Sequence, residues 1–136
     1  MTLTEAARNI FANDRFATEA TGVDIDHVDN LTAQCSLTLD ERHRNARGVA
    51  MGGVLFTMAD FAAAVAANSD CLSDGNLHWV SLNSSIHFLA PAAGNSLMAT
   101  ASPLKLGRTT ALYQTIIESP DNGKRIAIVE TTMMFI

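Results

Sequence analysis

The chain has 136 residues, which is enough for one domain with a sizeable core that needs neither disulfides nor a structural metal. Apolar residues make up 48% and charged residues only 17%, which excludes intrinsic disorder and suggests that another subunit covers part of the surface. The formal net charge of −5 argues against a non-specific nucleic-acid binder and a basic membrane-surface protein. We therefore expect a single domain over residues 1–136, with no nucleic-acid or membrane partner.

The cysteines, the histidines and the first residues bear on cofactors and location. Cys35 and Cys71 are too few for a disulfide framework and are expected to be reduced core residues. The four histidines show no helical ligand spacing and no cysteine partner, so we expect no metal site and no cofactor. The first residues lack a basic segment followed by an apolar one, and the apolar run 55–67 is too short to span a bilayer. The expected location is the cytoplasm.

The first half of the chain predicts two helices and a pair of strands. A short helix is expected from Thr4, which can cap it, to about Phe11. Residues 23–39 alternate apolar and polar side chains around a turn at Asp29-Asn30, which predicts two strands. A polar loop over 40–48 follows, and then an apolar helix from about Val54 to Ala67.

The second half changes to a period of two and predicts four strands, over 79–89, 96–106, 109–118 and 124–135. Pro103 lies inside one of them, so that strand is expected at an edge or bulged there. Only one long helix is available for six strands, and the crossover helices of a parallel sheet are missing. We expect an α+β fold in which an antiparallel six-stranded sheet curls around one central helix.

Asp60 is the only charged residue between Arg47 and Asp70, in a helix that is otherwise apolar. Burying a single carboxylate there costs free energy unless the group is hydrogen-bonded or hydrated. Burial would also raise its pKa toward the value that suits a general base. The alternative is that Asp60 lies on the one exposed stripe of the helix and is merely solvated.

Met51, Gly52 and Gly53 stand at the start of the same helix. Free amide N–H groups collect at a helix N-terminus and suit an oxyanion, and glycine lets a ligand approach the backbone, although a packing pair of glycines is the plainer interpretation. Asp60 lies eight residues beyond Gly52, or roughly 12 Å along the axis. Two such helices running antiparallel across a two-fold axis would bring Gly52 of one chain to Asp60 of the other, so a shared site would belong to a dimer.

The segment from His43 to Gly53, followed by Asp60, resembles the signature of the hotdog-fold acyl-CoA thioesterases of the phenylacetate-degradation type, Asn-x-x-Gly-x-x-His-Gly-Gly with an acid on the next helix. Residues 80–92, with Phe88-Leu89-Ala90-Pro91, look like the third strand of that family, and 106–109 resemble its Gly-Arg turn. The resemblance covers nearly the whole chain and implies a dimer or a dimer of dimers acting on a CoA-linked acyl substrate.

The resemblance implies a role for each matching position. Asp60 would activate water or attack the thioester, the Gly52 amide would bind the thioester oxygen, Asn45 would orient the carbonyl or the water, and Ser81 would be a polar helper. Met51 stands where the family has His and cannot donate a hydrogen bond. With Gly53 it is assigned to substrate binding beside Gly52. Ala90 stands where relatives often carry Arg.

Further candidates concern the binding of CoA. Lys105 and Arg108 flank Gly107 and could pair with phosphates, although a basic hairpin tip is also a common solvated feature. Asn83 is predicted to share one face of a strand with Ser81, a polar row that could line a pocket or an interface, or be a solvated edge. Two alternatives to the hydrolase stay open: a hotdog dehydratase or hydratase, which needs a catalytic His, and a non-catalytic acyl-CoA-binding module.

Overall fold

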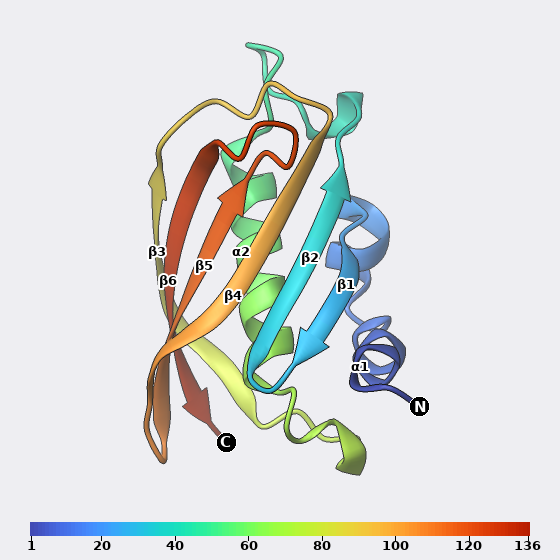
Figure 1. The fold of residues 1–136 in the computed structure, drawn as a ribbon, viewed down its shortest axis with the longest axis vertical. Coiled ribbons are helices and arrows are strands. Elements are labelled where there is room, and N and C mark those ends of the chain that lie inside the picture. Colours follow the sequence, from blue (N-terminus) through green and yellow to red (C-terminus); the bar gives the residue numbers. More distant parts are fainter.

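A six-stranded antiparallel sheet wraps around one central helix in the computed structural model, which describes residues 1–136 (Figure 1). The strand order is β1-β2-β4-β5-β6-β3, so β1 and β3 are the two edges. The expected α+β architecture is confirmed. The strands are β1 (Asp24–Asp29), β2 (Thr32–Thr38), β3 (Trp79–Phe88), β4 (Ser96–Leu106), β5 (Thr110–Glu118) and β6 (Arg125–Phe135). The helices are α1 (Leu3–Phe11) and α2 (Gly52–Ala67), with short helical turns at Phe16–Thr21, Glu41–His43 and Leu72–Asp74.

The central helix α2 carries most of the core. It begins at Gly52, two residues earlier than predicted, and its alanines let the sheet approach closely because they add little bulk. Its buried side chains pack against the inward faces of β2, β4, β5 and β6, including Cys35 and Tyr113. Burial raises the pKa of Cys35 to about 12, with smaller contributions from Asp26 and Asp24, so its thiol stays protonated at neutral pH. No helix of the structure combines the length and the apolar character that crossing a membrane requires.

The edge strand β1 is covered by α1. The guanidinium of Arg8 donates from Nε to the carbonyl of Ile25 at 2.8 Å, which satisfies an acceptor on the open edge of the sheet. The helix cap differs from the prediction: Thr2 forms a capping box with Glu5, and Thr4 instead accepts a hydrogen bond from the Val28 amide. The hydroxyl of Thr4 therefore joins α1 to β1.

Two strands contain bulges that matter for the site. In β4 the register shifts between Pro103 and Lys105, which confirms the predicted irregularity at the proline. In β3 the register with β6 shifts between Ser81 and Asn83, so that Leu82 is the extra residue. The outer edge of β3 is not paired with another strand of this chain.

Candidate active site

Asp60 and Ser81 form the first part of the candidate site. Asp60 lies on the half-exposed stripe of α2, and its Oδ1 accepts a 3.0 Å hydrogen bond from the hydroxyl of Ser81 on β3. The same hydroxyl lies 3.5 Å from the sulfur of Met133, which is fully buried. The carboxylate is thus fixed on one oxygen by a neighbouring strand, while its side of the helix stays open to a ligand.

The bulge at Leu82 brings Ser81 to this carboxylate. Ser81 pairs with buried Met133, whereas Asn83 pairs with Thr132, whose side chain lies on the opposite face of β6. The prediction that Ser81 and Asn83 share one face was therefore wrong, because an inserted residue reverses the alternation of a strand. Asn83 lies on the outer face of the sheet, away from Asp60.

Asn68, a residue not singled out from the sequence, holds the end of α2 to the start of β3. Its side chain is 1% exposed. Its Nδ2 donates to the carbonyls of Ala64 and Trp79, at 2.9 and 3.1 Å. Its Oδ1 accepts from the amides of His78 and Trp79, both at 2.9 Å. These four hydrogen bonds set the position from which β3 delivers Ser81 to Asp60.

The helix start forms a second part of the site. Met51 is the N-cap, makes no side-chain cap and is 56% exposed. Neither the Gly52 nor the Gly53 amide has an acceptor within the chain, so both N–H groups are free at the positive end of the helix dipole. A Cβ on Gly52 would lie 3.1 Å from the ring of Phe88, a tight contact that the exposed ring would have to relieve by a small shift. The geometry provides two donors for an oxyanion.

Asn45 lies next to this helix start. Its Oδ1 accepts from the Arg47 and Val49 amides at 2.9 and 3.3 Å, which leaves Nδ2 free to donate to a ligand. Asn45, Gly52 and Phe88 line a cavity of about 470 Å³ with a largely apolar wall. The loop is anchored by His43, which is 2% exposed.

His43 has a structural role in this loop. Its Nδ1 accepts from the Asp40 amide at 3.0 Å, so Nε2 carries the proton and donates to the carbonyl of Thr21 at 2.6 Å. Its own carbonyl accepts from the Met51 amide at 2.8 Å. Both ring nitrogens are therefore occupied, and the histidine holds the loop that precedes the Gly52 amide.

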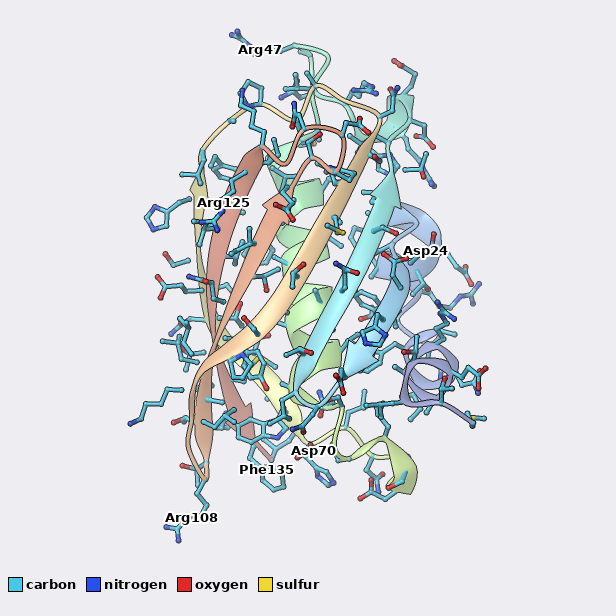
Figure 2. The ribbon with its side chains drawn as sticks, viewed as in Figure 1. Asp24, Arg47, Asp70, Arg108, Arg125 and Phe135 are labelled. Atoms are coloured by element: carbon cyan, nitrogen blue, oxygen red, sulfur yellow. The ribbon has the colours of Figure 1, made fainter.

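The two parts of the site do not meet within one chain. Gly52 and Asp60 lie on one continuous helix, roughly 12 Å apart along its axis. The β4–β5 hairpin, which carries Lys105 and Arg108, lies far from the helix start. Figure 2 shows Arg108 at the opposite end of the molecule from Arg47, which belongs to the loop before α2. The structure thus joins Asp60 to Ser81, and Asn45 to Gly52, as two separate half-sites.

Asp14 is a neighbour of Asp60 that no local pattern in the sequence identifies. It follows α1 and precedes the turn at Phe16–Thr21. The Phe11 ring of α1 packs edge-on against Phe61, the residue next to Asp60, with ring centres 5.7 Å apart. Asp14 is exposed, but the partial loss of hydration at its carboxyl raises its pKa above the ordinary 3.8, the charge of Asp60 raises it further, and the Ala17 amide opposes both. A second carboxyl group therefore stands close to the Asp60 half-site.

Comparison with known proteins agrees with the fold and shows the family to which the chain belongs. A family model described as the thioesterase superfamily matches residues 47–126, which include the helix start, Asp60 and Ser81. The chain belongs to this superfamily. Gly52 and Asp60 lie within the matched residues, whereas His43 and Asn45 precede them.

Individual members of the superfamily can be compared with this chain in sequence and in structure. The acyl-coenzyme A thioesterase PaaI of Escherichia coli is 35% identical over 108 residues, which are 79% of this chain and 73% of that protein. The solved structure of E. coli PaaI superposes with a TM-score of 0.85 at 27% identity and covers 99% of this chain and 96% of the other. A putative esterase of Deinococcus radiodurans is 33% identical over 93 residues, and the match spans only 60% of its length and 68% of this chain.

Proposed function

We propose that this protein hydrolyses acyl-CoA thioesters, with Asp60 as the base that activates water. The observation that carries the proposal is the Asp60–Ser81 hydrogen bond, which orients the one acidic group of an apolar helix. The E. coli relative bears the name of an acyl-coenzyme A thioesterase. Water would lose a proton to Asp60 and attack the thioester carbonyl. The C–S bond would then break, and the proton held by Asp60 would pass to the leaving thiolate, which releases the acid and CoA and restores the base.

The free amide of Gly52 suits the oxygen of the tetrahedral intermediate. Negative charge develops on that oxygen as water attacks, and preorganised backbone donors at a helix N-terminus stabilise it. Met51 offers no side-chain donor, so the backbone N–H groups and Nδ2 of Asn45 are the donors at this position. The apolar wall beside Phe88 would receive the uncharged part of the substrate next to the thioester.

The two half-sites require a second copy of the chain. A single chain holds them roughly 12 Å apart along α2, and an antiparallel α2 from a second copy would bring its Gly52 to this Asp60. The surface that such a copy would cover is open and partly apolar: Phe56 on α2 is 40% exposed, and Leu82 at the free edge of β3 is 52% exposed. We infer a homodimer, alone or as a dimer of dimers, with its sites at the subunit interface.

The proposed antiparallel dimer also suggests a role for the two cations of the β4–β5 hairpin. Lys105 lies near the end of β4, and Arg108 follows in the turn to β5. Figure 2 shows Arg108 at the opposite end of the molecule from Arg47, which belongs to the loop before α2. In an antiparallel pair, the hairpin of one copy lies near the Gly52 end of the other, where its cations could meet the phosphates of CoA. Met51 and Gly53 flank the proposed oxyanion position. Asn83 lies on the other face of the sheet and is not included in the proposed site.

The test is thiol release from a panel of acyl-CoA esters by the parent protein and by Asp60→Asn. Loss of a general base costs roughly two to four orders of magnitude in rate. Asp24→Asn is a matched control because Asp24 is exposed on β1, on the far edge of the sheet. An Asp60→Asn variant that hydrolyses esters at the parent rate would contradict the role of Asp60. Ester binding without turnover in the parent would instead identify a binding module.

A further inference from the structure

Arg42 lies in the loop that precedes α2 and joins this loop to the N-terminal part of the chain. Its Nη1 donates to the carbonyl of Ala20 at 2.9 Å and lies 3.5 Å from the carbonyl of Glu19. Both carbonyls stand at the end of the helical turn Phe16–Thr21, where no later amide of the turn can pair with them. The guanidinium of Arg42 therefore supplies the donors that the end of this turn lacks.

The head group of Arg42 is also held by Asp40 and Gly22. Its Nε lies 3.2 Å from Oδ2 of Asp40, whose Oδ1 accepts a hydrogen bond from the Arg42 amide at 3.0 Å. A Cβ on Gly22 would lie 3.0 Å from Nη2 of Arg42, so the guanidinium packs closely against that glycine. Although the Arg42 side chain is 52% exposed, these contacts give its head group a defined position.

The loop that Arg42 anchors leads directly to the helix start. The next residue, His43, contacts the carbonyl of Thr21 through Nε2, and its own carbonyl accepts from the Met51 amide at 2.8 Å. Met51 immediately precedes Gly52, whose free N–H is a proposed oxyanion donor. A continuous path of hydrogen bonds and backbone therefore runs from the turn Phe16–Thr21, through Arg42 and His43, to the Gly52 amide.

The proposed donors of the oxyanion position all depend on this path. Met51 has no side-chain donor, which leaves the backbone N–H groups and Nδ2 of Asn45. Asn45 belongs to the same loop, three residues after Arg42. An oxyanion donor acts when it lies about 2.7–3.1 Å from the oxygen that it stabilises. A small displacement of the loop would therefore move Asn45 and the Gly52 amide out of range together.

We propose that Arg42 is a positioning residue for the reaction, because it anchors the loop that carries Asn45 and leads to the Gly52 amide. Arg42 does not line the cavity beside Gly52, so it acts through its neighbours in the loop. The inference rests on the proposed function, since it concerns the donors of the same site. His43 is buried, whereas Arg42 is half exposed, so Arg42 can be truncated without leaving a buried void.

Steady-state kinetics with acyl-CoA esters test this role. We expect Arg42→Ala to lower kcat roughly tenfold to a hundredfold through misplaced donors. KM should change by less than about twofold, because the charge on the oxygen develops only in the transition state. Arg42→Lys keeps the charge but loses the planar fork, so it should restore only part of kcat. Arg15→Ala is the matched control and should keep the parent kcat, since Arg15 beside the same turn is 73% exposed and pairs with the Glu19 carboxylate.

A second measurement reports on the amides without any turnover. In protein that contains isotope-labelled glycine, the NMR signals of Gly52 and Gly53 should shift in Arg42→Ala and stay in place in Arg15→Ala. The signal of Gly107, which lies between β4 and β5, is the internal reference. Urea denaturation reports the stability of each variant. If Arg42→Ala does not fold, Arg42→Lys provides the same comparison.

Three results would overturn the proposal. The first is unshifted Gly52 and Gly53 signals in the Arg42 variants. The second is a parent kcat in Arg42→Ala, even with lower stability, which would leave Arg42 a structural role only. The third is an equal loss of kcat in Arg15→Ala. If the parent releases no thiol from any ester, the proposed hydrolysis fails, and the glycine signals alone then decide whether Arg42 positions the two amides.

Discussion

The hydroxyl of Ser81 donates a 3.0 Å hydrogen bond to Oδ1 of Asp60, although 21 positions separate the two residues in the chain. The contact depends on two features that lie outside both residues. The bulge at Leu82 determines which face of β3 carries Ser81, and Asn68 fixes where β3 starts relative to the end of α2. The orientation of the proposed base is therefore a property of the helix–strand junction.

Removing the Ser81 hydroxyl tests what this contact contributes to the proposed reaction. We expect Ser81→Ala to lower kcat for acyl-CoA hydrolysis roughly tenfold to a hundredfold, because a hydrogen bond to a charged group that orients the base is lost. Ser85→Ala is the matched control, since Ser85 is exposed on the outer face of the same strand. Steady-state kinetics would contradict the expectation if both variants kept the parent kcat.

Replacing Asn68 tests the junction itself. Asn68→Ala removes four buried hydrogen bonds and leaves the His78 and Trp79 amides without their acceptor. We expect the free energy of unfolding to fall by about 3 kcal/mol in urea denaturation. Asn76→Ala, at an exposed loop position, should leave stability close to that of the parent. A loss under about 1 kcal/mol for Asn68→Ala would show that the junction does not depend on this side chain.

Mixing inactive variants tests the proposed sharing of sites between two copies. In Gly52→Val the new side chain lies against the ring of Phe88, and we expect it to block the proposed oxyanion position. Co-expressed with Asp60→Asn, it should form mixed dimers in which one site carries both lesions and the other carries neither. Random two-fold pairing then predicts recovery of about a quarter of the parent activity.

A matched pair of variants serves as the control for the mixing experiment. Asp60→Asn and Ser81→Ala affect the same half-site, so every site in their mixed dimers carries one lesion. We expect no recovery from this pair beyond the residual rate of the Ser81→Ala half-site. Equal activity of the two mixtures, with mixed dimers shown by mass spectrometry, would contradict a composite site.

Asp14 predicts a pH dependence of stability. Its pKa in the folded protein is raised by partial loss of hydration and by the charge of Asp60, so the folded state holds this proton at pH values where the unfolded state has lost it. Stability from this group is therefore greatest below its ordinary pKa of 3.8 and declines as the pH rises through the raised value. Asp14→Asn, which cannot ionise, should melt at a higher temperature than the parent at pH 7.

The measurement is thermal unfolding of both proteins from pH 3 to pH 7. The difference in melting temperature should grow across the acidic range and then level off, because the parent alone pays the cost of ionising Asp14. Asp121→Asn, at an exposed turn between β5 and β6, should follow the parent. A constant difference at every pH would show that Asp14 acts through contacts that do not involve its charge.

The fold could be predicted from two features of the sequence. These are the alternation of apolar residues in the strands and the presence of a single long helix. The strands follow a period of two, and the chain lacks the crossover helices that a parallel sheet needs. An antiparallel sheet around a central helix is then the economical arrangement, and the structure shows this arrangement. The resemblance around Gly52 and Asp60 likewise follows from local spacing, because both residues lie on one helix whose rise is fixed.

Only the tertiary structure decided which strand residues reach the helix. A bulge shifts a strand by one residue without a reliable local signal, so Ser81 and Asn83 could be assigned to one face by alternation and still lie on opposite faces. The proximity of Asp14 to Asp60 and the hydrogen bonds of Asn68 to the start of β3 arise from segments that are distant in the chain. Such contacts depend on how the elements pack, which no local periodicity specifies.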